Sequence, residues 1–249
     1  MIQGGFASLG MYDYPHTSAA NDTLWELARN HLGYGPSHLT RDKDAWDIWQ
    51  SPDLVFSQTC GLPYRAKLHD KVQLVGTPDY GINGCPAGYY CSVIVVQNTS
   101  VLQNIHALNN MRIAYNDGLS QSGWAAPYAH MKTAGVAFEI GPCTGGHKAS
   151  AQAVAIGQAD FAAIDAVTWE MLQIDDRETA QQLRVIAKTA PTPALPFITS
   201  LRQDSDAIAT AVEHAIAALP AVTHDALLLN GLVQLPSSAY LEIPIPPLP

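Results

Sequence analysis

Short apolar runs rich in β-branched and aromatic residues alternate along the chain with segments of helical periodicity. The runs that predict strands are residues 6–12, 53–59, 72–75, 89–97, 112–115, 138–140, 161–164, 183–187 and 197–200. The segments that predict helices are residues 21–31, 122–134, 148–157, 167–174 and 204–219. Strands that alternate with helices imply parallel sheets covered on both faces, so the sequence predicts an α/β fold. The proline-rich end, residues 243–249, predicts an extended tail.

The alternation predicts two lobes. The long strand that ends at residue 97 and a proline-rich crossing at residues 191–196 bracket a self-contained α/β block. We therefore expect one lobe built from residues 1–97 and 196–249 and a second lobe built from residues 98–195. Two chain crossings between lobes make a hinge, and ligands of such folds bind in the cleft between the lobes.

Charge and hydropathy exclude two classes of partner. The chain of 249 residues has 13 Lys and Arg against 22 Asp and Glu, a formal net charge of −9. Surfaces that bind nucleic acid normally show a basic excess, so nucleic acid is not an expected partner. No apolar run approaches the roughly 18 to 20 residues that span a membrane. The acidic balance also means that an anionic ligand has to be held by local dipoles.

The cysteines, histidines and tyrosines predict no metal and no cofactor. No CxxC pair occurs, so a structural zinc site is not expected. The nine histidines and ten tyrosines form no local cluster of the kind that binds ferric ion. Cys85 and Cys91 are close enough in sequence to pair in an oxidising compartment, but their spacing does not decide this.

The most informative segment is residues 116–124, Asn-Asp-Gly-Leu-Ser-Gln-Ser-Gly-Trp, which follows a strand and opens a helix. The N–H groups of Gln121, Ser122 and Gly123 would be unpaired at the helix start. Together with the hydroxyls of Ser120 and Ser122, and with the positive end of the helix dipole, they predict an anion site. The alternative is an ordinary serine N-cap.

A second strand-to-helix turn is formed by residues 143–150, Cys-Thr-Gly-Gly-His-Lys-Ala-Ser. Its two glycines allow the backbone to approach a ligand closely. His147 falls in the first helical turn, where the dipole favours a neutral imidazole that can donate to an oxyanion. The alternative is a glycine-rich turn with a surface histidine. Two such turns in one block favour binding, because ligands of open α/β sheets bind at the carboxyl ends of strands.

Four other residues fall at predicted strand ends. Asp165 could accept from a phosphonate hydroxyl or a ligand amine, or it could cap the helix that begins near residue 167. Tyr12 and Tyr64 offer hydroxyl donors and flat walls, although tyrosines at strand ends are also common as packing. Cys60 lies at a strand-to-helix turn, where a thiol becomes more acidic, but no His or acid is tied to it by a recognised spacing. We therefore expect no catalytic residue.

These motifs together resemble a known family. Residues 145–165, from Gly145-Gly-His-Lys-Ala to Phe-Ala-Ala-Ile-Asp165, are similar to the hallmark of the phosphonate-type substrate-binding proteins of ABC importers. The segment Asp117-Gly-Leu-Ser-Gln-Ser-Gly123 resembles the hydroxyl-rich anion loop of that family. Gln58-Thr-Cys-Gly61 and Met11-Tyr12-Asp13 are weaker matches. The resemblance runs from residue 6 to about residue 200.

The resemblance implies a two-lobed, type 2 periplasmic-binding-protein fold, in which each lobe is a mixed sheet flanked by helices. It also implies that the protein has no enzymatic activity. The ligand-binding residues expected on this basis are Ser120, Gln121, Ser122, His147 and Asp165 of the second lobe and Tyr12, Cys60 and Tyr64 of the first.

We therefore expect a solute-binding protein that captures a small oxyanion of the phosphonate or phosphate class, with an ABC permease as its partner. Because the expected pocket has few cations, a sulfonate, a phosphate ester or a pyrimidine-like organic ligand stays open. The resemblance implies a periplasmic location. The opening residues have neither a basic nor a long apolar stretch typical of a secretory signal, which leaves a cytoplasmic location open.

Two alternatives belong to other functional classes. A cytoplasmic sensor or regulatory module of the same fold would contact a protein partner rather than a membrane permease. A cysteine-dependent enzyme would use Cys60 or Cys143 together with His147, and it would show turnover and sensitivity to thiol alkylation.

Overall fold

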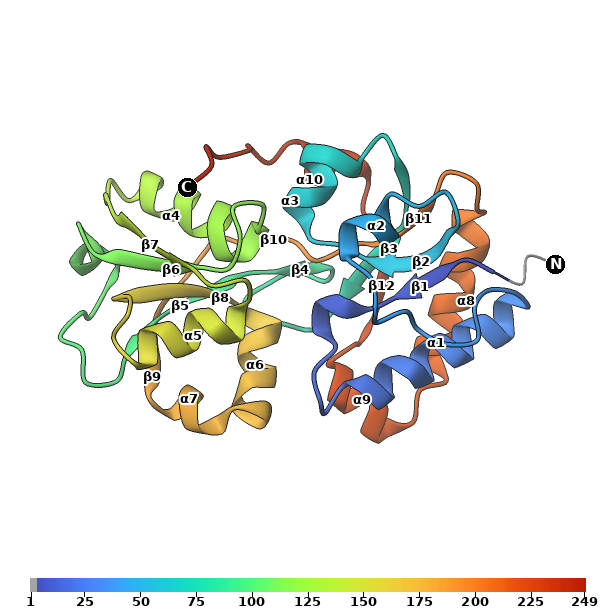
Figure 1. Cartoon of the computed structure of the whole chain (residues 1–249), viewed down its shortest axis with the longest axis horizontal. Helices are drawn as coiled ribbons and strands as arrows, with labels where there is room; N and C mark the ends of the chain where they lie inside the picture. Colours follow the sequence, from blue (N-terminus) through green and yellow to red (C-terminus); the bar gives the residue numbers. More distant parts are fainter. Residues whose placement is uncertain (1–3) are drawn as a thin grey trace. The chain divides into compact units, whose positions relative to one another are not determined.

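The computed structural model describes residues 4–249 and divides the chain into two compact α/β units (Figure 1). The described part of unit 1 comprises residues 4–89 and Pro193–Ile243, and unit 2 comprises Tyr90–Thr192 and Pro244–Pro249. The chain passes from one unit to the other at three places. The first two passages are made by strands β4 (Tyr89–Tyr90) and β10 (Thr192–Pro193), which pair as a two-stranded sheet.

Unit 1 is built on a mixed five-stranded sheet. Its strands, in spatial order, are β1 (Phe6–Ser8), β2 (Leu54–Gln58), β11 (Phe197–Ser200), β3 (Val72–Asp79) and β12 (Gly231–Val233). In Figure 1, one side of this sheet carries α1 (Ser18–Leu32), α8 (Ser205–Ala217) and α9 (Ala221–Leu227). The other side carries α2 (Ala45–Trp49), α3 (Gly61–Pro63) and α10 (Ser237–Leu241). Every residue of β2 and β11 is buried, as expected for strands covered on both faces.

Aromatic side chains fill the core of unit 1. Phe56 of β2 lies between Trp25 of α1 and Phe197 of β11, with ring centroids 5.8 and 4.8 Å away. On the opposite face, Trp49, Tyr64 and Tyr240 belong to one buried cluster. Helix α1 ends at Leu32 and is followed by Gly33, whose φ of 80° is the left-handed conformation that glycine adopts readily.

Unit 2 is built on a second mixed sheet. Its strands, in spatial order, are β7 (Glu139–Cys143), β6 (Arg112–Tyr115), β8 (Phe161–Asp165), β5 (Ser92–Gln97) and β9 (Leu183–Lys188). In Figure 1, the helices on one side are η4 (Gln121–Ala125) and α4 (Ala126–Thr133). Those on the other side are α5 (His147–Ala155), α6 (Ala166–Asp175) and α7 (Arg177–Gln181). Short helical turns elsewhere are η1 (Gly10–Tyr12), η2 (Tyr64–Leu68) and η3 (Ile105–Leu108).

The structure corrects three expectations about the sheets. Parallel pairing is right for β1–β2, β6–β7 and β6–β8, but β5 and β11 pair antiparallel to their neighbours. These two strands follow passages between the units rather than helical crossovers, so nothing requires a parallel direction. Strand β5 was expected in the first lobe and is instead paired within the unit 2 sheet. The strand expected over residues 6–12 ends at Ser8, because η1 begins at Gly10.

None of the helices within residues 4–249 has the length and apolar character needed to cross a membrane.

Candidate functional site

Three strand-to-helix turns of unit 2 meet at one edge of its sheet. Parallel strands β6, β7 and β8 end at Tyr115, Cys143 and Asp165, and each is followed by a turn that leads into a helix. The first two turns are hydrogen-bonded to each other, since the N–H of Thr144 donates to the carbonyl of Tyr115 at 2.9 Å. The common edge predicted from the sequence is therefore present, and it brings the polar side chains of separate segments together.

Ser122 and His147 are in direct contact across two of these turns. The Ser122 hydroxyl oxygen lies 2.8 Å from Nε2 of His147. Ser122 is buried and belongs to η4, whereas His147 is the first residue of α5. The sequence singled out both turns, and the structure joins them through this hydrogen bond between a hydroxyl and an imidazole.

Ser120 is the N-cap of η4, which was the alternative left open for this residue. Its hydroxyl oxygen accepts from the N–H of Gly123 at 2.9 Å. The expectation that the Gly123 N–H is unpaired is therefore wrong, because the preceding serine already satisfies it. A Cβ at Gly123 would lie 1.8 Å from Oδ1 of Asn116, so a larger residue here would force the Asn116 side chain to move.

His147 is held in its neutral form by burial. Although the residue as a whole is partly exposed, its Nδ1 atom is buried. Burial lowers the pKa of His147 to about 4, and the backbone of Ala163 offsets only part of this effect. The sequence predicted a neutral imidazole from the helix dipole, and the structure gives desolvation as the main cause. At neutral pH the side chain is a hydrogen-bonding group without charge.

Three polar residues beside this pair were missed by the sequence analysis. Ser92, at the start of β5, lies opposite Asp165 in the sheet register, and its hydroxyl donates to the carbonyl of Ser122 at 2.8 Å. The N–H of Ser92 donates to the Thr189 hydroxyl at 2.9 Å. Thr192 accepts from the Gln121 side-chain amide at 3.5 Å. Thr192 lies in the proline-rich crossing and Thr189 lies just before it, and neither residue gave a separate signal in the sequence.

Asp165 caps helix α6. Its Oδ1 atom accepts from the N–H groups of Val167 and Thr168 at 2.8 and 3.1 Å, and the residue is almost fully buried. Of the two roles that the sequence left open, the structure therefore contains the capping role. A further contact from this carboxylate to a ligand stays a prediction.

We expect Asp165→Ala to lower the free energy of unfolding by about 1 kcal/mol, because the change removes the acceptor of two N–H groups. Asp165→Asn keeps an acceptor oxygen in the same position and should cost clearly less. Urea unfolding of both variants measures the difference. Equal losses in the alanine and asparagine variants would contradict the capping role.

Unit 1 gathers a second group of polar and aromatic residues around Tyr12. The Tyr12 ring packs edge-to-face on Tyr80, with centroids 5.3 Å apart. The Gln58 side-chain amide donates to the Tyr80 hydroxyl at 2.8 Å. These three residues line a cavity of about 20 Å³ inside unit 1, which has room for one water molecule. Gln58 and Tyr80 were not among the predicted site residues.

An ionic cluster holds the segment that carries Tyr12. The backbone carbonyl of Tyr12 accepts from Thr17 at 2.7 Å and from Asn21 at 3.1 Å. The next residue, Asp13, accepts from Nε of Arg41 at 2.6 Å and also from Asn21 at 3.1 Å. Burial by itself raises the pKa of Asp13, but the hydrogen bonds from Arg41 and Asn21 outweigh it, so the pKa lies below its ordinary value.

The lowered pKa of Asp13 predicts a pH-dependent contribution to stability. A carboxyl whose folded-state pKa is depressed stabilises the fold above its ordinary pKa of 3.8, and this contribution is lost as the pH falls through the folded-state value. We expect Asp13→Asn to cost about 1 kcal/mol at pH 7 and progressively less below pH 4. Urea unfolding at several pH values tests this, with the exposed Asp70→Asn as control. A cost that stays constant down to pH 2 would contradict the assignment.

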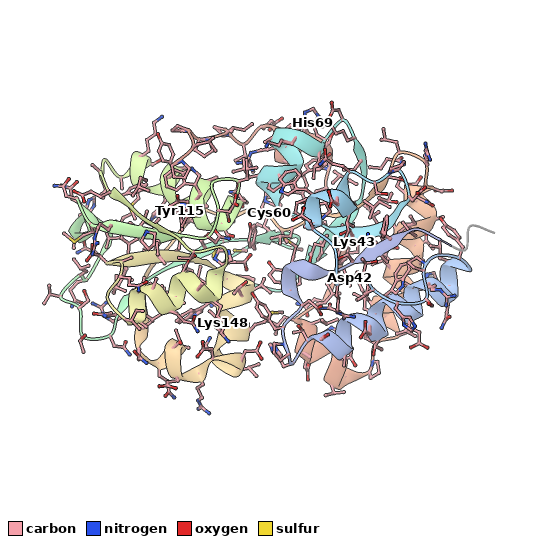
Figure 2. All side chains as sticks on the ribbon, viewed as in Figure 1. Asp42, Lys43, Cys60, His69, Tyr115 and Lys148 are labelled. Carbon is pink, nitrogen blue, oxygen red and sulfur yellow. The ribbon has the colours of Figure 1, made fainter. Side chains whose placement is uncertain are left out.

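Tyr64 and Cys60 have different surroundings from Tyr12. Tyr64 is 2% exposed, packs on Tyr240 with ring centroids 5.2 Å apart, and has a pKa raised by burial. These contacts correspond to the packing role that the sequence left open. Cys60, which is labelled in Figure 2, lies after β2 at the position that precedes α3. Its carbonyl accepts from the N–H of Tyr64 at 3.1 Å. A ligand contact for either residue stays a prediction.

The hydrogen-bond partners argue against a Cys143–His147 pair as the catalytic alternative. The Nε2 atom of His147 contacts the Ser122 hydroxyl, whereas the thiol of Cys143 contacts the carbonyl of Asn116 at 3.7 Å. All four cysteines are present as thiols. Within residues 4–249, no group of three or more His, Cys, Asp and Glu side chains is arranged to hold a metal ion.

Comparison with known proteins gives one family match. Residues 53–235 match the family described as the periplasmic substrate-binding protein of the ABC phosphonate transporter. These residues include Cys60, the hydroxyl-rich loop, His147 and Asp165. No curated protein sequence matches the chain.

Solved structures share the fold at low sequence identity. PhnD1 from Prochlorococcus marinus, in complex with methylphosphonate, has a TM-score of 0.72 and 16% identity, over 96% of this chain and 94% of that one. The binding protein component of an ABC phosphonate transporter from Pseudomonas aeruginosa has a TM-score of 0.69 and 16% identity, over 96% and 84%. A histidine kinase sensor domain similar to periplasmic binding proteins has a TM-score of 0.58 and 15% identity, over 93% and 98%.

Proposed function

Since the chain belongs to the family of periplasmic substrate-binding proteins of ABC phosphonate transporters, we propose that it binds a small phosphonate through the hydroxyl-rich edge of unit 2. The family is a solute-binding component of an importer, and that role applies to this chain. The identity of the solute, the residues that bind it and the absence of turnover are parts of the proposal.

The contact between Ser122 and His147 carries the assignment of the binding residues. We propose that the imidazole binds ligand as the tautomer with its proton on Nε2, in which it donates to the Ser122 oxygen at 2.8 Å and leaves the serine proton for an oxyanion; the other tautomer would accept that proton. The N–H of Ser122 also lies in the first turn of η4, before the first hydrogen bond inside that helix. We propose that these neutral donors bind the phosphonate oxygens, with Asp165 as acceptor for a ligand hydroxyl or amine.

Because the protein has a net charge of −9, an anionic ligand has to be held by local hydrogen-bond donors rather than by the overall field. Lys148, labelled in Figure 2, is the one Lys or Arg of the segment at residues 143–150. Its Nζ atom forms an ion pair with Asp176 at 3.6 Å. Each hydrogen bond to a charged oxygen contributes about 1.5 to 3 kcal/mol, and micromolar affinity needs about 8 kcal/mol. Three to five such bonds are therefore sufficient without a nearby lysine or arginine.

The surroundings of His147 also favour binding over catalysis. A general base works best with a pKa near the operating pH, whereas burial lowers that of His147 to about 4. In a serine triad, a carboxylate orients the histidine that acts as the base. The group that acts on the His147 ring is instead the backbone of Ala163. We propose that the protein is not an enzyme, that its partner is an ABC permease, and that it acts in the periplasm.

Thermal unfolding with a ligand panel tests this function. Protein that has been unfolded and refolded to remove any bound ligand is heated with phosphate, phosphite, methylphosphonate, 2-aminoethylphosphonate or sulfate. A ligand that binds only the folded state raises the melting temperature, and the stabilisation grows with the logarithm of the ligand concentration relative to Kd. We expect a phosphonate to give the largest rise. A larger rise with sulfate, or none with any anion, would overturn the proposed ligand class.

A further inference from the structure

The last described segment of the chain, Pro244–Pro249, belongs to unit 2 although the helix before it, α10, belongs to unit 1. Four of its six residues are proline. Proline-rich segments are extended and lose little conformational freedom when they bind, so such a segment can be held by few contacts.

The segment contacts both ends of the loop that carries the binding serines. At one end, the indole N–H of Trp124 donates to the carbonyl of Pro247 at 2.9 Å. At the other end, a Cβ added to Gly118 would lie 3.0 Å from Pro249 and 3.4 Å from Leu248. Gly118 precedes Ser120 by two residues, and Trp124 follows Ser122 by two residues. The segment therefore spans the stretch in which Ser120 and Ser122 lie.

Trp124 is a rigid anchor for this contact. It is 2% exposed and packs among the rings of Tyr115, Tyr128 and Phe138, with centroids 5.6 to 5.9 Å away. By contrast, Ile245 and Leu248 are 58% and 71% exposed. Burial of these apolar side chains contributes little, so the indole hydrogen bond and the close approach at Gly118 hold the segment.

We propose that Pro244–Pro249 and Trp124 position the hydroxyl-rich loop for anion binding. This inference rests on the proposed function. It adds Pro244–Pro249 to the residues that determine the affinity for the anion. Trp124 acts as a positioning residue, since its indole N–H is engaged with Pro247 and is not offered to a ligand.

Two variants test the positioning role. One variant lacks residues 244–249, and the other is Trp124→Phe, which keeps a ring but removes the N–H donor. The matched control is Trp169→Phe in α6 of the same unit. Amide hydrogen exchange of residues 119–123 is measured on ligand-free protein, and methylphosphonate affinity is measured by calorimetry.

We expect both variants to exchange faster at residues 119–123 and to bind methylphosphonate about three- to ten-fold more weakly, the equivalent of one lost hydrogen bond. The control should change neither quantity. Unchanged exchange in the shortened protein would overturn the inference even if Trp124→Phe lowered the melting temperature. Should the wild-type protein fail to bind methylphosphonate, the proposed function fails, while the exchange result still decides the positioning role.

Discussion

Ser122→Ala should weaken methylphosphonate binding by about ten- to a hundred-fold while leaving the melting temperature of the ligand-free protein nearly unchanged. The hydroxyl is the only group removed, and a hydrogen bond to a charged oxygen contributes about 1.5 to 3 kcal/mol. The loss should be large because Ser122 is buried and its oxygen lies 2.8 Å from Nε2 of His147, a contact that restricts the orientation of the serine hydroxyl.

The pair also predicts coupling between two variants. His147→Ala removes the partner that orients the serine, so the double variant should lose less affinity than the sum of the two single losses. Ser100→Ala is the matched control, because this partly exposed serine follows β5 at its far end, away from Ser92. Calorimetry of the wild-type protein, the two single variants and the double variant measures the cycle. Additive losses would contradict the coupling of the two residues, and an equal loss in the control would contradict a binding role for the pair.

Phe161→Ala should lower the stability of unit 2 by about 3 to 5 kcal/mol, the usual cost of emptying a large buried aromatic position. Phe161 is fully buried in β8 and packs edge-to-face on Phe138 at 6.1 Å. Its cluster includes Ile94 of β5 and Ile113 of β6, so the lost contacts reach the central strands of that sheet.

The same substitution in unit 1 provides the comparison. Phe56→Ala empties a fully buried position between Trp25 and Phe197. Hydrogen exchange followed by mass spectrometry should show faster exchange in β5, β6 and β8 for the Phe161 variant and in β2 and β11 for the Phe56 variant. If either variant accelerated exchange equally in both sheets, the two units would not be separate cores.

Buried strands were predictable because their composition is distinctive. The run predicted at residues 89–97 is divided into β4 and β5, and the run at 161–164 is β8 with one added residue. Elements such as α10 and β12 were missed, since they are short and make their stabilising contacts with residues far away in the sequence. The direction of a strand could not be predicted from the local sequence either. Strands β5 and β11 contain the same residue types as the parallel strands, and they run antiparallel because each follows a passage between the units.

Site residues in strand-to-helix turns could be predicted from the sequence, whereas those brought to the site by strand pairing could not. Glycine and hydroxyl residues between a strand and a helix marked the segments of Ser120, Ser122 and His147, and the structure joins the last two. Ser92 gave no such signal, because a serine at the start of a strand is common. Its role follows from lying opposite Asp165 and from donating to the Ser122 carbonyl, and both are products of the three-dimensional pairing.

Calorimetric titration of refolded, ligand-free protein with methylphosphonate tests the central claim most directly. The proposed site predicts binding at one site per chain with a Kd in the micromolar range or tighter, because three to five charge-assisted hydrogen bonds supply the required free energy. No binding of methylphosphonate, with sulfate or an unrelated organic solute binding instead, would contradict the assignment of the hydroxyl-rich edge of unit 2 as a phosphonate site.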